Sequence, residues 1–290
     1  MGFMSSLGNF RYKLATFSVA EKIILVNVLC FIFPMLLNTL LFLLNIRSVG
    51  YMNWIQLSPK FETFVTRPWT IISYSFIHSG FFHLLWNMIL LFFSGRLLLN
   101  LFPNRVFVNN YFLGIIAGGL IFILSYALFP VFKGSYPPMI GASAGVMAVF
   151  IFICTYTPNQ EIRVLFLNLK LKYLGIIFFL LDVIQIPNGN AGGHLAHIGG
   201  ALLGFFYANQ LTKGRDIGIG FEKIWQSLFF NKNLRTVYKA TEKGQSEYFS
   251  KNEEIIHQKK IDEILDKISK SGYDTLSKEE KDFLFEAGKK

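Results

Sequence analysis

Charged residues are scarce in this chain, and acidic residues are nearly absent from its first 211 positions. Asp, Glu, Lys and Arg make up 16% of the 290 residues, whereas 52% are hydrophobic. In soluble domains about a quarter of all residues are charged. Residues 1–211 hold 12 basic residues and only 4 acidic ones: Glu21, Glu62, Glu161 and Asp182. This composition excludes an ordinary soluble domain and predicts a polytopic membrane protein.

Cysteine is also rare, which excludes a disulfide framework. Cys30 and Cys154 both lie inside apolar runs, where a thiol behaves as a small hydrophobic group. The net charge of +10 comes mostly from loops between apolar segments. We therefore interpret it as a topology signal, and we expect no nucleic-acid partner.

Six apolar segments follow one another along the chain. They cover residues 23–46, 81–101, 106–132, 141–157, 173–187 and 194–211. The first is too long for the core of a signal peptide, while the fourth and fifth are short for spanning helices. The fold class predicted is an all-α polytopic membrane bundle of six transmembrane helices, with residues 1–22 as an N-terminal segment and 23–211 as the membrane domain.

The distribution of Lys and Arg predicts the orientation. With both ends inside, the inner side of residues 1–211 holds eight basic residues and the outer side four. We expect an integral multi-pass protein, in a bacterial plasma membrane, with both termini cytoplasmic. The long outer link, 47–80, is rich in aromatic residues, and we expect part of it to lie at the membrane interface.

Residues 212–290 form a separate cytoplasmic tail in this interpretation. Its first part, 221–239, mixes aromatic residues with lysines, and it fits either a helix on the anionic leaflet or a solvated linker. The remainder predicts a helical hairpin over 252–285, because Ser277 and Glu280 have the spacing of a capping box. No catalytic pattern occurs in the tail, and its partner is not indicated.

Polar residues inside the apolar segments suggest chemistry. His83 and Asn87 are four residues apart on one helix face, Ser143 opens the fourth segment, and His194 and His197 begin the sixth. The predicted topology brings Ser143, His83, Asn87 and His197 to one depth near the outer surface. Acyl transfer uses a serine nucleophile, an imidazole base, and amide or imidazole groups that donate hydrogen bonds to the oxyanion. These four residues could supply all three.

Each of these residues also has a structural interpretation. A serine among glycines and alanines usually serves helix packing, and a histidine on an apolar helix is usually a hydrogen-bonded packing residue. A metal site from His78, His83, His194 and His197 is the weaker alternative, since we expect no carboxylate at that depth. Asp182 either orients a histidine or, as we expect, faces the outer interface.

Three motifs in order resemble the rhomboid intramembrane serine proteases. They are "RPWTIISYSFIHSGFFHLLWNM", "GASAG" and "AHIGGALLG", within the first 211 residues. The resemblance implies a six-helix rhomboid-like bundle, Ser143 as nucleophile and His197 as general base. It also implies an oxyanion pocket made by Asn87, His83 and the Ser143 backbone N–H.

The resemblance assigns supporting residues as well. His194 lies one turn before the base, and Gly200 and Gly204 bring the fourth and sixth helices together. Independently of the resemblance, Gly141 is small enough to leave room for a substrate beside the serine. His78 is given a structural role. Met147 stands where an aromatic residue usually packs on the base, and the outer link shows no clear tryptophan–arginine pair.

The leading hypothesis is therefore an intramembrane serine endopeptidase that uses a Ser143–His197 dyad on single-span membrane proteins, with no cofactor and no metal. A non-catalytic rhomboid-like protein that binds membrane clients is the alternative from another class. A small transporter is a third, but it would predict internal repeats that the sequence lacks.

Overall fold

The computed structural model describes residues 16–46, 50–164, 166–229, 260–270, 272 and 275–287. The chain divides into two compact units, Met1–Phe230 and Asn231–Lys290.

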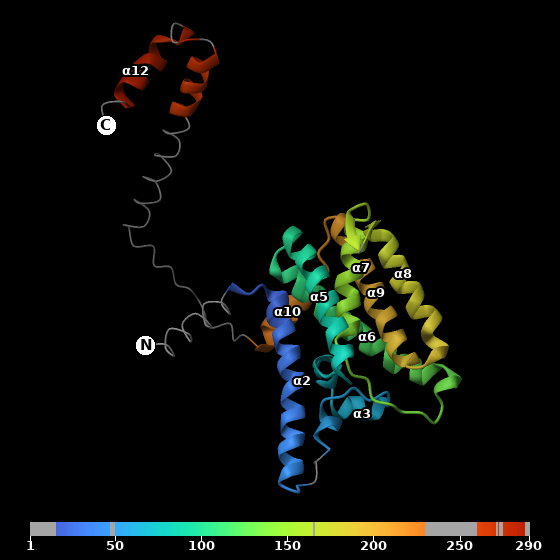
Figure 1. The fold of residues 1–290 in the computed structure, drawn as a ribbon. Helices are drawn as coiled ribbons and strands as arrows, with labels where there is room; N and C mark the ends of the chain where they lie inside the picture. The colour runs from blue at the N-terminus through green and yellow to red at the C-terminus, as the bar shows by residue number, and fades with distance from the viewer. Residues whose placement is uncertain are drawn as a thin grey trace. The chain divides into compact units, whose positions relative to one another are not determined.

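Six long helices build the first unit (Figure 1). They are α2 (Val19–Leu43), α5 (Phe81–Leu101), α6 (Asn104–Leu128), α7 (Ser143–Tyr156), α8 (Leu171–Gln185) and α9 (Ala191–Thr212). Each coincides with one predicted apolar segment to within a few residues. The predicted class, an all-α polytopic membrane protein, is confirmed.

The number of membrane crossings remains a prediction. Among the described residues, four helices are long and apolar enough to cross: α2, α5, α6 and α8 with its extension to Asn188. α7 has 14 residues, which at 1.5 Å per residue span about 21 Å of a hydrocarbon core about 30 Å thick. Histidines, glycines and amides lower the hydropathy of α9.

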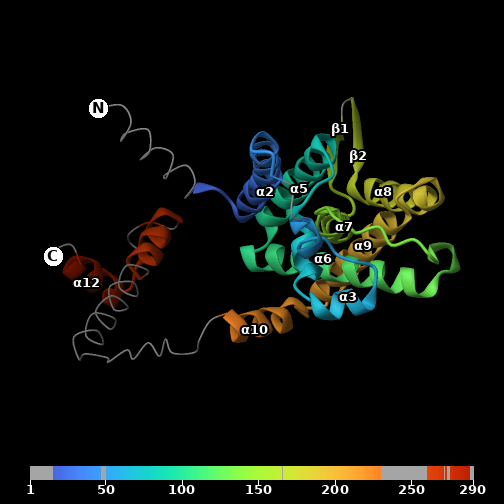
Figure 2. The same ribbon diagram turned by 90° about the horizontal axis from the view of Figure 1, so that it is seen from below.

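Helix α7 is the centre of the bundle and is surrounded by α5, α6, α8 and α9 (Figure 2). Every residue from Ala144 to Cys154 is buried. Small residues on α9 allow the closest approach, because Cβ atoms added at Gly200 and Gly204 would collide with the backbone of Ala144 and Ala148. Small residues permit such contacts between membrane helices. Here they join α7, which begins with Ser143, to α9, which carries His197.

The link between α2 and α5 folds into four short helices. They are η1 (Tyr51–Trp54), α3 (Phe61–Thr66), α4 (Thr70–Ser73) and η2 (Tyr74–Phe76). Arg67 lies 4.2 Å over the ring of Trp54, which stacks on Trp69. Arg67 also donates a 2.6 Å hydrogen bond to the Asn53 carbonyl. The link therefore does contain a tryptophan–arginine pair, and the sequence did not reveal it because the two residues are brought together only by folding.

The opposite end of the bundle carries a short hairpin that the sequence did not predict. Strands β1 (Glu161–Val164) and β2 (Leu167–Lys170) pair antiparallel, with Glu161 opposite Lys170, between α7 and α8. Helix α10 (Gly218–Phe229) packs against α6. It overlaps the first half of the segment expected on the leaflet, and residues 230–239 lie outside the described part of the chain.

Asp216 connects the helices at this end. Its carboxylate accepts hydrogen bonds from the Tyr207 hydroxyl at 2.6 Å and from the Gly218 N–H at 2.9 Å. It also lies 3.5 Å from the Arg105 guanidinium. These contacts join α6, α9 and the start of α10.

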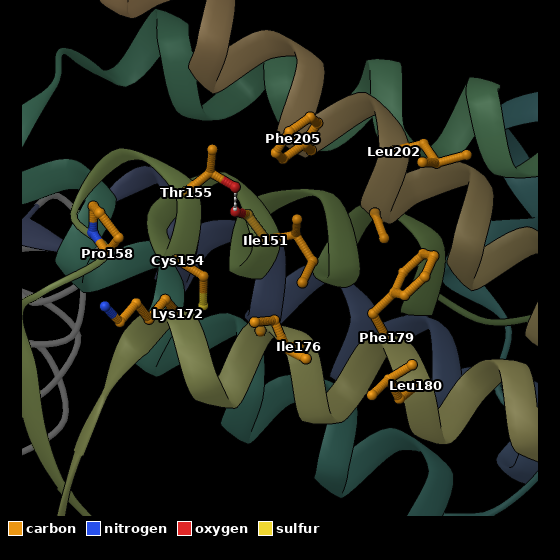
Figure 3. Close-up of a pocket in the computed structure, with 12 residues that line it drawn as sticks. Ile151, Cys154, Thr155, Pro158, Lys172, Ile176, Phe179, Leu180, Leu202 and Phe205 are labelled. Atoms are coloured by element: carbon orange, nitrogen blue, oxygen red, sulfur yellow. Dashed lines mark hydrogen bonds between the residues drawn. The ribbon is translucent and has the colours of Figure 1, made fainter.

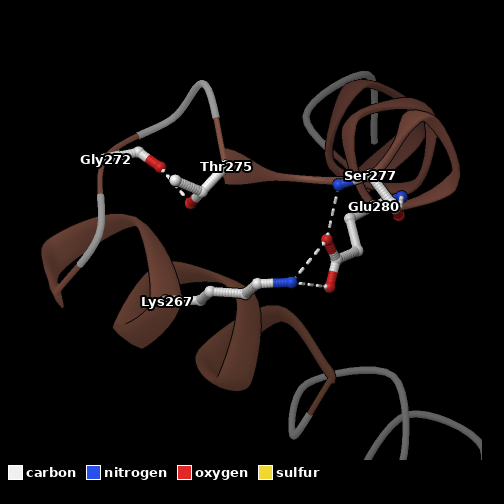
Figure 4. Close-up of polar contacts among 5 residues, drawn as sticks. All are labelled: Lys267, Gly272, Thr275, Ser277 and Glu280. Atoms are coloured by element: carbon white, nitrogen blue, oxygen red, sulfur yellow. Dashed lines mark hydrogen bonds and ion pairs between the residues drawn. The ribbon is translucent and has the colours of Figure 1, made fainter.

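The second unit contains a helix over residues 260–270 and helix α12 (Lys278–Ala287). The capping box predicted from the sequence is formed, since Ser277 Oγ accepts from the Glu280 N–H at 3.2 Å and Glu280 Oε2 accepts from the Ser277 N–H at 2.7 Å. Lys267 from the preceding helix donates to both Glu280 oxygens (Figure 4). The part of the predicted hairpin before residue 260 lies outside the described residues.

Candidate active site

Ser143 is the first residue of α7, and the chain that leads to it is fixed by the outer link. Leu57 and Met139 exchange both backbone hydrogen bonds, at 3.1 and 2.8 Å. The Gly141 N–H donates to the Tyr74 carbonyl at 3.0 Å. The start of α7 is thus held in place from residues 57 and 74, while its free N–H groups and positive dipole end lie at Ser143.

Gly141 is required by both conformation and space. Its φ of +119° lies in a region that favours glycine. A Cβ added there would lie 2.8 Å from Cε1 and 2.9 Å from Nε2 of His83, and 3.7 Å from Ser143 Oγ. The imidazole edge of His83 therefore faces the backbone immediately before the serine.

The first turns of α5 supply two polar groups. His83 Nδ1 is 3.0 Å from Ser79 Oγ, which leaves Nε2 directed toward Gly141. Asn87 is 8% exposed, and its Nδ2 donates a 2.8 Å hydrogen bond to the His83 carbonyl of its own helix. Both residues lie on one helix face, as their spacing of four predicted.

His78 precedes α5 and contacts the backbone directly before Ser143. Its Nε2 accepts from the Ala142 N–H at 3.4 Å, and its ring makes an edge contact with His83. Burial lowers the pKa of His78 to about 4, with repulsion from His83 as a smaller cause. His78 is therefore neutral near pH 7 and serves as an acceptor.

Two cavities meet at the serine. One, of about 630 Å³, lies among α5, α7, α8 and α9. The other, of about 470 Å³, is lined by the loop before Ser143, by α6 and the start of α9, and by two residues of the outer link. Ser143, His83 and His197 line both cavities, and Asn87 and Met147 line the first. Four of the residues predicted for the site therefore meet at one end of the bundle. No hydrogen bond joins Ser143 to His197 within the described chain.

Asp182 is the residue that sequence reasoning placed wrongly. Instead of facing the outer interface, it is 8% exposed, and its Oδ1 lies 2.7 Å from His194 Nδ1 and 2.8 Å from His197 Nδ1. A carboxylate does stand at the depth of the histidines, contrary to expectation. The available signal was its type, because an acidic residue within an apolar helix is a functional candidate by default.

The same three residues are the ones that come nearest to a metal site in the described part of the chain. Their candidate ligand atoms lie within 4.8 Å of one another. His78 and His83, which belonged to the metal set considered from the sequence, are not in this group. The separations of 2.7 and 2.8 Å are those of two N–H groups donating to one carboxylate oxygen, so we describe the cluster as hydrogen-bonded.

A further apolar pocket of about 450 Å³ lies among α7, α8 and α9 (Figure 3). It is lined by Cys154, Lys172 and aliphatic and aromatic side chains, and the hydrogen bond drawn there is from Thr155 Oγ1 to the Ile151 carbonyl within α7. Neither serine nor histidine lines it. This pocket therefore holds no serine–histidine pair.

Fold and site together define an integral membrane protein whose helices enclose buried polar residues around a serine. The chain belongs to the rhomboid family, because the family model of the Rhomboid domain matches residues 65–213, half of its length. The matched region contains Ser143 and the residues before it, His83 and Asn87 of α5, and the two histidines of α9.

Curated relatives share part of the chain. It is 28% identical over 165 residues to presenilin-associated rhomboid-like protein A, mitochondrial, of Danio rerio, covering 56% of this chain and 40% of that protein. It is 29% identical over 157 residues to the Rattus norvegicus presenilin-associated rhomboid-like protein, covering 53% and 38%. RHOMBOID-like protein 12 of Arabidopsis thaliana is 26% identical over 158 residues, covering 50% and 47%.

This chain therefore spans less than half the length of these relatives. All three carry mitochondrial names, which goes against the bacterial plasma membrane expected from the sequence. The Lys and Arg distribution distinguishes the two sides of a membrane and does not identify the membrane. Residues 250–290 match DUF6576, a family of unknown function.

Proposed function

We propose that this chain is an intramembrane serine endopeptidase that hydrolyses peptide bonds in or near the transmembrane helix of single-span membrane proteins. Ser143 is the nucleophile and His197 the general base in this proposal. Both termini lie, in this proposal, on the side of the membrane that holds the larger number of Lys and Arg residues. The observation that carries the proposal is that Ser143, His83 and His197, from three helices, line the same two cavities.

The proposed reaction follows from this grouping. His197 removes the hydroxyl proton as Ser143 Oγ attacks the scissile carbonyl carbon, and it returns that proton to the leaving amine when the C–N bond breaks. A water molecule then hydrolyses the acyl enzyme with the same base. The cavities give water a route to the serine, which the surrounding lipid does not provide.

The oxyanion is stabilised in this proposal by three donors. They are the Ser143 backbone N–H, Asn87 Nδ2 and His83 Nε2, with the dipole of α7 behind them. Asn87 exchanges its internal bond to the His83 carbonyl for the oxyanion as substrate enters. His83 Nε2 acts as donor when Ser79 Oγ donates to Nδ1.

The substrate class follows from the position of the site. Apolar side chains on α5 and α8, including Trp86 and Phe178, line the larger cavity on its way to the lipid. A helix must unwind before its carbonyls reach Ser143, since intact backbone bonds shield them. We therefore expect cleavage near small or helix-breaking residues of the substrate span.

The test is cleavage of tagged single-span proteins by the full chain, with Ser143→Ala as the inactive variant. Ser94→Ala is the control for loss of a serine hydroxyl inside the bundle, because Ser94 is buried and its hydroxyl donates to the Leu90 carbonyl of its own helix. We expect fragments with wild type and Ser94→Ala, and none with Ser143→Ala. A fluorophosphonate probe should label the same two active forms.

Two results would overturn the proposal. Fragments that persist with Ser143→Ala would exclude the serine as nucleophile. Capture of intact membrane proteins without any probe labelling would favour the non-catalytic client-binding protein.

A further inference from the structure

One carboxylate oxygen in the membrane part of the protein receives hydrogen bonds from two histidines. Asp182, on α8, lies 2.8 Å from His197 Nδ1 and 2.7 Å from His194 Nδ1, and both contacts use Oδ1. The side chains are 11% exposed for Asp182, 20% for His197 and 18% for His194. The three side chains are therefore mostly buried between α8 and α9.

The cluster is costly to hold at this depth. A carboxylate among apolar helices loses its hydration, which is unfavourable unless donors replace the water. Asp182 is the single acidic residue of α8, a helix that is otherwise almost wholly apolar. Two imidazole N–H groups compensate for the loss, and both come from α9.

We infer that Asp182 is a positioning residue for His197, with His194 anchoring the carboxylate, so that the proposed dyad works as a Ser143–His197–Asp182 relay. This inference rests on the proposed function. The hydrogen bond places the proton of neutral His197 on Nδ1, which leaves Nε2 free to accept the serine proton. The carboxylate then stabilises the imidazolium formed when that proton arrives, and it remains ionised throughout.

The second histidine explains why the carboxylate has one orientation. His194 occupies the same oxygen from one turn earlier on α9, so the carboxylate cannot rotate away from His197 without losing two bonds. Its ring also meets that of His197 edge to face, with centroids 5.7 Å apart. Within the described chain this is the aromatic contact of His197, and Met147 lines the same cavity as His197. The orientation of the base thus depends on Asp182 and His194.

The surroundings of His197 hold few other titratable groups. Those that line its two cavities, bond to it or contact its ring are His83 from α5, Tyr126 from α6, Asp182 from α8, His194 from α9 and Tyr74 from the outer link. Asp182 is the only acid among them. Removing its charge therefore removes the attraction that favours protonated His197.

The test compares Asp182→Asn with wild type in the purified full chain, by kcat and KM for a cleaved single-span substrate from pH 5 to pH 9. Asn keeps the shape and an acceptor oxygen but not the charge. We expect kcat/KM to fall by about 10²- to 10⁴-fold, chiefly in kcat, and the acid limb of the profile to move to lower pH. Asp182→Ala should fall further, because the acceptor is lost as well.

Asp216→Asn is the matched control. Asp216 has a side chain 10% exposed and accepts two hydrogen bonds, but it lies at the other end of the bundle. It should leave the position of the acid limb unchanged. Any general loss of folding stability from replacing a buried carboxylate appears in both variants, whereas the shifted limb appears in Asp182→Asn alone.

Three outcomes would overturn the inference. If Asp182→Asn keeps the wild-type kcat and pH profile while Ser143→Ala is inactive, the proposed protease function is supported and the role of Asp182 as a positioning residue is refuted. If Asp182→Asn lowers kcat equally at every pH, Asp182 is structural. If EDTA abolishes wild-type activity and Zn²⁺ restores it, the cluster is a metal site. A wild-type chain without activity in every assay would instead remove the proposed function, and the relay with it.

Discussion

The contact between α7 and α9 at Gly200 gives the most demanding prediction. A Cβ at this position would lie 2.8 Å from the carbonyl carbon and 3.1 Å from the Cα of Ala144, and still closer to its carbonyl oxygen. Carbon atoms in contact prefer separations of about 3.5–4.0 Å. Gly200→Ala therefore requires α9 to move about 1 Å away from α7, since the colliding atoms belong to the backbone and no side chain can rotate to make room.

That displacement acts on the proposed site directly. Ala144 follows Ser143, and Gly200 lies three residues after His197, so the separation of the two helices separates the base from the nucleophile. A misplacement of about 1 Å costs on the order of 10²-fold in rate. Overpacking of this kind also destabilises a fold by about 1–3 kcal/mol. We expect Gly200→Ala to lose at least that factor in kcat/KM and to unfold at lower temperature.

The assay is substrate cleavage and thermal unfolding of the purified full chain. Gly220→Ala is the control, because it is the same substitution in a helix, and no atom lies within 4 Å of the added Cβ. It should keep activity and unfold no earlier than wild type. Wild-type activity and unfolding temperature in Gly200→Ala would refute the reasoning, since the helices would then have room that the structure denies.

Two further predictions concern α5 and the tail. Asn87→Ala should lower kcat about 10²–10³-fold with little change in KM, because an oxyanion donor acts in the transition state; a rise in KM alone, measured with the same substrate, would contradict this role. In the tail, the Lys267 ammonium and the Ser277 N–H lower the pKa of Glu280 below its usual 4.5, so their stabilisation is present above that value and is lost as pH falls below it. Hydrogen exchange of residues 278–287 in the full chain, corrected for its intrinsic rate, should therefore speed up in acid, and Glu280→Gln should remove this dependence; identical acid response in both forms would refute it.

Much of the architecture could be predicted from local pattern. Hydrophobic runs cover whole membrane helices, so their positions were close to the observed bounds of α5 and α9. The spacing of four between His83 and Asn87 determines a common helix face whatever the tertiary structure. The Ser277–Glu280 capping box depends on three residues of sequence separation, and it too was correctly anticipated.

Some contacts between distant segments were decided by the tertiary structure alone. Trp54 and Arg67 pair because short helices in the outer link turn back on one another. Asp182 meets His194 and His197 because α8 and α9 pack with a particular rotation about their axes, and apolar residues all around α8 leave that rotation unmarked in the sequence. The hydropathy of the sequence shows which segments enter the membrane. The packing of the helices against one another determines which side chains of those segments come into contact.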